Sequence, residues 1–266
     1  SNGLEMAAGN KMKTILEKLT SNRILGVLVG ALVTAIIQSS SATTVMVVGF
    51  VNSGLMSLTS AVWVIMGANI GTTITGQLIA IDITAIAPLI AFIGVAMIVF
   101  FKSQKLDAIG GVIGGLGILF IGMETMSNAM VPLRTMPEFV GLISKFQNPF
   151  IGILVGALFT ALIQSSSASV GILQALAKSG VMTLSSSIYV LFGQNIGTCI
   201  TSVLASIGTS KNAKRTTIIH LSFNIIGTVL FVTISMLFPF ADLVQSLTPS
   251  NVAAQIANVH TIFNVT

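Results

Sequence analysis

Long apolar runs make up most of this chain, and two of them are interrupted near their centre by the same polar cluster. The run 24–51 contains Gln-Ser-Ser-Ser-Ala at 38–42, and the run 150–177 repeats it letter for letter at 164–168. The cluster leaves arms of about a dozen residues, whereas a helix that crosses the hydrocarbon core needs about twenty. Each run therefore predicts a re-entrant helical hairpin, with serine hydroxyls and helix ends satisfying the backbone at its tip.

The two halves of the chain repeat each other at one constant offset. The step of 126 residues that carries Gln38 onto Gln164 also carries Asn69-Ile-Gly-Thr onto Asn195-Ile-Gly-Thr, and no gap is needed over about fifty residues. A duplicated polar cluster in an apolar chain points to a site formed where the halves meet. We expect two repeats of inverted topology, at 1–126 and 127–266.

Two further apolar segments, 58–81 and 184–207, are long enough to cross a bilayer but carry a glycine-rich polar stretch. The first reads Gly-Ala-Asn-Ile-Gly-Thr-Thr from position 67, and the second reads Gly-Gln-Asn-Ile-Gly-Thr from position 193. These interruptions predict discontinuous transmembrane helices. Plain helices are expected at 84–101, 106–131, 216–238 and 252–266, and surface segments at 10–23 and 132–148.

The composition places the chain in the membrane class. Of its 266 residues 53% are hydrophobic and only 7% are charged, and the mean hydropathy is +0.98. This favours a single all-α, polytopic transmembrane domain over residues 1–266. The net charge of +5 does not indicate nucleic-acid binding, because the basic residues form short groups between apolar segments. The chain opens without methionine and stops inside an apolar run, so we expect a longer protein truncated at both ends.

The distribution of basic residues predicts an orientation. If each hairpin returns to its own side, nine of the twelve Lys and Arg residues fall on one face and three on the other. The positive-inside rule then makes the richer face cytoplasmic in the cell membrane and supports the inversion of the second repeat. The cytoplasmic basic loops would be Lys11–Arg23, Lys102–Lys105 and Lys211–Arg215.

No enzyme motif stands out, and no cofactor is expected. The chain has no Gly-x-Ser-x-Gly elbow, no His-Glu-x-x-His and no phosphate loop with lysine. The nearest alternative is an intramembrane serine hydrolase in which a tip serine is activated by His220 or His260. An enzyme needs one nucleophile, however, and here the serine tip is duplicated, so we predict that the chain is not an enzyme.

The polar residues fit a transport site better. Hydroxyl and carboxamide oxygens suit sodium rather than a transition metal, and N–H groups at helix starts suit an anion. Because the apolar segments carry almost no charged residue, an anion is balanced most simply by sodium ions bound beside it, and this balance couples their movement. We predict substrate binding by Gln38, Ser39, Ser40, Ser41, Gln164, Ser165, Ser166 and Ser167. We predict sodium binding by Gln38, Asn69, Thr72, Thr73, Gln164, Asn195 and Thr198.

The paired Gln-Ser-Ser-Ser motifs, each followed by Gly-x-Asn-Ile-Gly-Thr, resemble the type II sodium-dependent phosphate cotransporter family, in its bacterial form. The resemblance covers nearly the whole chain. It implies an inverted-repeat bundle with re-entrant hairpins and sodium-coupled symport of inorganic phosphate by alternating access. The implied partners are inorganic phosphate, sodium and the lipid bilayer, and a homodimer is compatible with the sequence. Transport of another oxyanion, or phosphate export, is the alternative reading.

His220-x-x-Phe-Asn and His260-x-x-Phe-Asn also look typical of this family. A histidine early in an apolar helix is more often a structural hydrogen-bonding residue, so neither is assigned to the site. No tip carries the acidic residue that an additional sodium site in electrogenic relatives would need.

Overall fold

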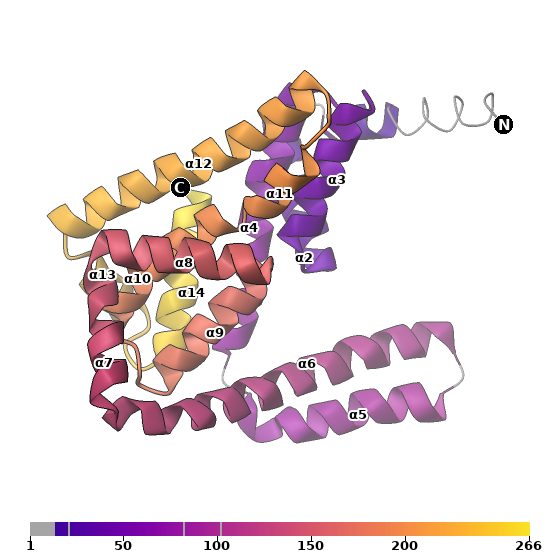
Figure 1. Ribbon diagram of the computed structural model, residues 1–266. Helices are drawn as coiled ribbons and strands as arrows, with labels where there is room; N and C mark the ends of the chain where they lie inside the picture. Colours follow the sequence, from indigo (N-terminus) through magenta and orange to yellow (C-terminus); the bar gives the residue numbers. More distant parts are fainter. Residues whose placement is uncertain (1–13, 21, 82, 102) are drawn as a thin grey trace.

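The computed structural model describes residues 14–20, 22–81, 83–101 and 103–266, and all of its regular secondary structure in these ranges is helical (Figure 1). The expected all-α polytopic membrane fold is confirmed. Residues 14–19 are helical and belong to the predicted surface segment. Residues 10–13 of that segment, with Lys11 and Lys13, and Lys102 of a predicted basic loop lie outside the described residues.

Both predicted hairpins form helix–turn–helix units. The first consists of α2 (Arg23–Ile37) and α3 (Ser40–Asn52), and the second of α8 (Pro149–Ile163) and α9 (Ser166–Lys178). These helices are 13 to 15 residues long, too short to cross a bilayer alone. The bounds of the two hairpins differ by the sequence offset of the repeats, so the same letters produce the same local structure.

The turn at each tip is built by the glutamine and the first serine of the motif. Gln38 and Gln164 end their helices with φ of 59° and 58° in the left-handed region, where the backbone N–H bonds the carbonyl four residues earlier. Ser39 and Ser165 then cap the following helices, each accepting a hydrogen bond from the alanine N–H three residues on. The motif therefore ends one helix and starts the next within two residues.

The prediction of a discontinuous helix at 58–81 is wrong. Helix α4 (Leu58–Ala80) continues through the whole interruption. Its glycines serve close packing instead: a Cβ added at Gly67 would lie 2.0 Å from the carbonyl oxygen of Val27 on α2, and one at Gly71 would lie 2.4 Å from that of Ala31. Only glycine permits this approach.

The second helix, predicted at 184–207, has a short interruption. Helix α10 (Leu184–Gly197) and α11 (Ile200–Ala205) are separated by a turn at Thr198 and Cys199. Its glycines pack against α8 in the same way, since a Cβ at Gly193 would lie 2.0 Å from the carbonyl oxygen of Ile153. The expected pair of broken helices is therefore one continuous and one interrupted helix.

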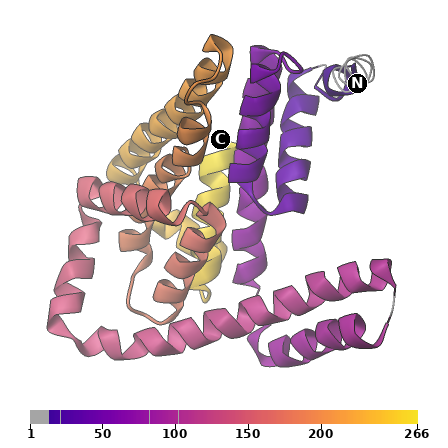
Figure 2. The ribbon, with the colours of Figure 1, turned by 45° about the vertical axis from the view of Figure 1, so that its right-hand side comes forward.

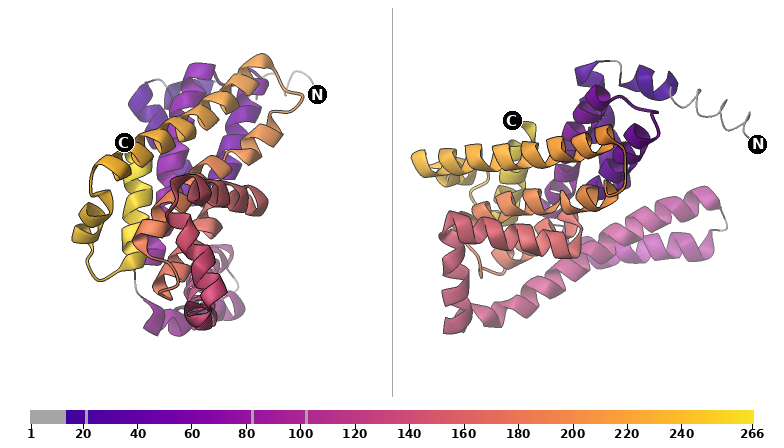
Figure 3. Two further views of the ribbon diagram at one scale, coloured as in Figure 1. Left: turned by 60° about the vertical axis from the view of Figure 1, so that its left-hand side comes forward. Right: turned by 45° about the horizontal axis from the view of Figure 1, so that its top comes forward.

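A hairpin of two apolar helices follows α4. A short 3-10 turn, η1 (Thr84–Ile86), leads into α5 (Ala87–Phe100), which packs against α6 (Gln104–Met130). Gly94 and Gly114 bring the two backbones together, since a Cβ on Gly94 would lie 2.0 Å from the amide nitrogen of Gly114. This pair projects from the other helices in both Figure 2 and Figure 3.

The remaining helices complete the second half. The predicted segment 132–148 forms η2 (Val131–Thr135), α7 (Pro137–Ser144) and η3 (Lys145–Gln147), which together turn the chain from α6 to α8 (Figure 2). The chain then ends in α12 (Lys211–Leu237), α13 (Phe240–Leu247) and α14 (Val252–Val265). Among the described residues, four helices are long and apolar enough to cross a membrane, or five if the bent pair formed by 137–147 and 149–163 counts as one span.

Helix α4 and the α10–α11 helix run in opposite directions. Near the start of α4, the N–H of Ser210 from the loop after α11 donates to Asn52 Oδ1 at 2.8 Å. Just after the end of α4, Thr84 Oγ1 accepts a hydrogen bond at 3.2 Å from Lys178 Nζ, which ends α9 shortly before α10 begins. Helix α14 lies between them, and Phe263 stacks on Phe192 of α10 with 5.4 Å between ring centroids. The inversion of the repeats across a bilayer and their boundaries stay predictions.

Candidate functional site

The two hairpin tips meet at equivalent serines. Ser40 is the first residue of α3 and Ser166 is the first residue of α9, and their hydroxyl oxygens lie 3.2 Å apart. Both side chains are buried, with 3% and 7% of their surface exposed. Beside them Ser41 Oγ donates to the carbonyl of Gln164 at 3.4 Å. The amino-terminal ends of two short helices therefore face each other at one point.

A small cavity surrounds this contact. It is lined by both serines and by buried residues of α4 and of the α10–α11 helix, and its volume is about 10 Å³, close to the minimum for one water molecule. The lining includes the predicted residues Ser40, Asn69, Thr72, Ser166, Asn195 and Thr198. These six come from opposite halves of the chain in three equivalent pairs.

The other predicted residues lie around the cavity rather than on its wall. Gln38 and Gln164 are exposed at the tips. Gln38 Oε1 accepts a hydrogen bond from Thr75 at 2.5 Å, and Thr75 accepts one from Ser167 at 3.3 Å, so the second tip is tied to the first through α4. Ser39 and Ser165 act as helix caps. Thr73 is buried and donates to the carbonyl of Ile70.

Two histidines that the sequence reasoning excluded reach this site. His220 of α12 lies 3.2 Å from Asn69, and His260 of α14 lies 3.2 Å from Asn195, in both cases between histidine Nε2 and asparagine Oδ1. His260 also lines the cavity, as do Asn224 and Asn264 four residues after each histidine. The shared His-x-x-Phe-Asn spacing, with buried polar groups inside apolar helices, was the available signal.

The buried polar side chains that the structure describes carry no formal charge. None of the buried residues in the described part of the chain is Asp, Glu, Lys or Arg. There, no group of three His, Cys, Asp or Glu could hold a metal ion. The Nδ2 groups of Asn69 and Asn195 are buried with no hydrogen-bond partner. The site thus offers N–H donors and positive helix ends to an anion, and hydroxyl and amide oxygens to a hard cation.

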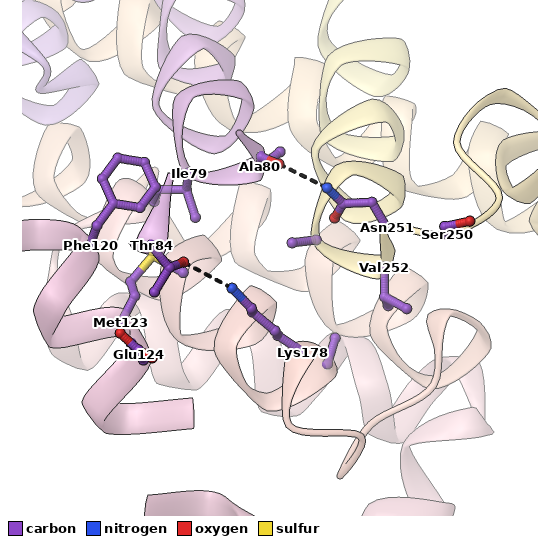
Figure 4. A pocket seen from close by; sticks show the side chains of 12 residues that line it. Ile79, Ala80, Thr84, Phe120, Met123, Glu124, Lys178, Ser250, Asn251 and Val252 are labelled. Atoms are coloured by element: carbon purple, nitrogen blue, oxygen red, sulfur yellow. Dashed lines mark hydrogen bonds between the residues drawn. The ribbon is translucent and has the colours of Figure 1, made fainter. Parts of the chain in front are cut away.

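A larger cavity of about 200 Å³ lies elsewhere, between the end of α4, α6, the end of α9 and the start of α14 (Figure 4). Lys178 Nζ donates there to Thr84 Oγ1 at 3.2 Å, and Glu124 of α6 is also on its wall. None of the predicted site residues lines it. It is a second location against which the position of a bound substrate can be judged.

Comparison with known proteins identifies several relatives of the chain. It is 32% identical over 266 residues to "Uncharacterized protein YqeW" of Bacillus subtilis, covering 99% of this chain and 85% of that protein. It is 29% identical to "Putative inorganic phosphate export protein YjbB" of Salmonella typhimurium over 92% of this chain, which is 45% of that protein. A stretch of 83 residues, 30% of this chain and 13% of the relative, is 41% identical to "Sodium-dependent phosphate transport protein 2A" of Ovis aries.

No solved structure matches the chain. The family model described as Na+/Pi-cotransporter matches residues 1–128 and 135–248, which contain both serine tips and both Asn-Ile-Gly-Thr segments. The chain therefore belongs to the Na+/Pi-cotransporter family.

Proposed function

We propose that this chain is the core of a transporter that moves inorganic phosphate together with sodium by alternating access. The observation that carries the proposal is the meeting of two helix starts at Ser40 and Ser166. Each helix start presents unbonded backbone N–H groups and the positive end of a helix dipole. Two such ends facing each other without an acidic side chain favour an anion between them.

Sodium coupling follows from the lack of buried charge. Among the described residues no lysine or arginine is buried, so a phosphate anion between the tips would have no such side chain beside it, and burying an unpaired charge is costly. Sodium ions held by neutral oxygens supply the missing positive charge. Phosphate and sodium then bind more tightly together than apart, which is a reciprocal coupling between their sites.

The closed tips imply that transport requires movement. A cavity of about 10 Å³ has room for about one water molecule and none for phosphate. Substrate therefore enters only when the two hairpins separate, first toward one side of the membrane and then toward the other. The opposite directions of α4 and the α10–α11 helix suit this exchange, because each hairpin can open toward a different face.

Phosphate export is the second candidate. The relatives named YjbB carry the words "inorganic phosphate export" in their names. The same site would serve export if the sodium gradient did not drive inward movement. Transport of another oxyanion uses the same chemistry and is a further outcome of the test. The orientation with basic loops in the cytoplasm and assembly as a homodimer stay predictions.

Reconstituted vesicles test the proposal. Purified protein is inserted into liposomes, and uptake of radiolabelled phosphate is followed with sodium outside, with sodium on both sides, and with sodium replaced by potassium. Sodium-coupled symport predicts accumulation above the equilibrium level only with the inward sodium gradient. Equal transport in potassium would refute sodium coupling, and sodium-driven uptake of labelled sulfate without uptake of labelled phosphate would point to another oxyanion.

A further inference from the structure

We infer that the second repeat contains a buried sodium site that the first repeat lacks, formed by Thr160 Oγ1, Ser169 Oγ and Gln194 Oε1. All three oxygens are buried and have no hydrogen-bond partner. The side chains come from α8, α9 and α10, the three helices of the second hairpin and its neighbour. The inference rests on the proposed sodium-coupled transport and adds an ion site outside the cavity between the tips.

In the first repeat the equivalent hydroxyl groups are hydrogen-bonded to each other. The equivalents of Thr160 and Ser169 are Thr34 and Thr43, whose hydroxyls bond each other at 3.0 Å. The equivalent of Gln194 is Ala68, which carries no polar atom. In the second repeat an added carboxamide and unpaired hydroxyls occupy the corresponding position. The difference leaves three acceptors where the first repeat has a satisfied pair.

The three side chains lie where α8, α9 and α10 pack against one another. Gln194 Nε2 donates to the backbone carbonyl of Ser169 at 3.0 Å, so its side chain lies against α9. Thr160 lies against α10, because its Cβ is 2.9 Å from the position of a Cβ on Gly197. Thr160 and Ser169 are fully buried and Gln194 is 2% exposed, so none of the three oxygens is satisfied by bulk water.

The chemistry of the cluster fits a small hard cation. Because the amide nitrogen of Gln194 donates to a carbonyl, the other atom of the carboxamide is identified as oxygen, an acceptor only. Hydroxyl oxygens can likewise ligate a cation through their lone pairs. The neutral oxygen set suits sodium and not a transition metal. A buried water is the other occupant that could satisfy these groups, and it is an outcome of the test.

Occupancy of this site would have an asymmetric effect. A sodium ion bound to α8, α9 and α10 fastens the second hairpin to its neighbouring helix, while the first hairpin has no such ligand set. The ion would therefore hold one tip in place while the other moves. The two halves of a symmetric fold would then differ in how they respond to sodium.

Sodium binding to purified protein tests the inference. The number of bound ions is measured with radioactive sodium in choline buffer for the wild type, Gln194→Ala and Ser169→Ala. Thr43→Ala, the change equivalent to Ser169→Ala, is the matched control. We expect both second-repeat variants to lose one sodium ion or to bind it about tenfold more weakly or worse, and the control to keep the wild-type number.

A second measurement tests the site if Gln194→Ala or Ser169→Ala does not fold. Thr160→Val replaces one hydroxyl with a methyl group of similar size, and the sodium-dependent rise in melting temperature should shrink in it but not in Thr34→Val. Unchanged sodium number and affinity in a folded Gln194→Ala protein would overturn the inference and leave a water as the occupant. If that variant and the wild type still carry phosphate with sodium, the proposed function stands and only the extra site fails. If the wild type binds no sodium, both fail.

Discussion

Replacing Ser40 and Ser166 separately by alanine should weaken phosphate transport in both cases. The two hydroxyls lie 3.2 Å apart and are buried, so water does not screen the hydrogen bonds that either hydroxyl makes. In the substrate-free protein each change removes one neutral hydrogen bond, about 1 kcal/mol, which is too little to unfold the chain. A hydrogen bond to a charged phosphate contributes about 1.5–3 kcal/mol. Each variant should therefore raise the KM for phosphate by about 10- to 150-fold.

The assay is uptake of labelled phosphate into vesicles at saturating sodium, with KM and kcat measured separately. Ser53→Ala is the control, because Ser53 is exposed at the other end of α3 and donates only to carbonyls of its own helix. Its KM should stay within about twofold of the wild type, since such surface changes have small effects. If one serine variant is silent while the other abolishes uptake, the shared site between the tips is wrong.

Three further changes test the fold and the movement of the tips. Gly67→Ala should destabilise the protein by about 1–3 kcal/mol or more because its Cβ would meet the α2 backbone, whereas Gly111→Ala, which faces open space, should leave the melting temperature unchanged. Gln38→Val should lower the melting temperature more than Gln38→Asn, because a β-branched residue resists the left-handed backbone by about 1–2 kcal/mol. In a cysteine-free background, Ser40→Cys combined with Ser166→Cys should form a disulfide, and the weakened transport that the reduced variant shows at high phosphate should stop when the disulfide forms; transport that continues with the disulfide intact would show that the tips do not separate.

The hairpins could be predicted to within one residue because local rules determine them. A polar motif in the middle of an apolar run leaves two arms too short to span, and the motif itself carries residues that end and start helices. The repeat offset then transferred the same prediction to the second half. The meeting of the tips also followed, since equivalent polar clusters in two halves have to be buried against each other.

The continuity of α4 could not be predicted from the amino-acid sequence alone. A glycine can break a helix or let another backbone approach it, and both readings fit Gly67 and Gly71. The neighbouring α2 decides between them, because its carbonyls lie where the missing side chains would be. That contact depends on tertiary packing, which the spacing of glycines does not specify.

The role of the histidines was missed for a similar reason. His220 lies 151 positions from its partner Asn69, and His260 lies 65 positions from Asn195. The repeat offset relates the two asparagines but not the two histidines, so the symmetry argument that located the tips could not identify the histidine–asparagine pairs. A buried histidine in an apolar helix needs a partner, and only the fold identifies it.

The position of bound phosphate tests the central claim most directly. A high-resolution structure of the protein with sodium and phosphate, compared with one in which phosphate is kept and sodium is replaced by choline, would locate the anion. The account predicts phosphate density between the first turns of α3 and α9, within hydrogen-bond distance of Ser40 and Ser166 and present only with sodium. Phosphate in the larger cavity beside Lys178 and Glu124, with the tips unchanged, would contradict it.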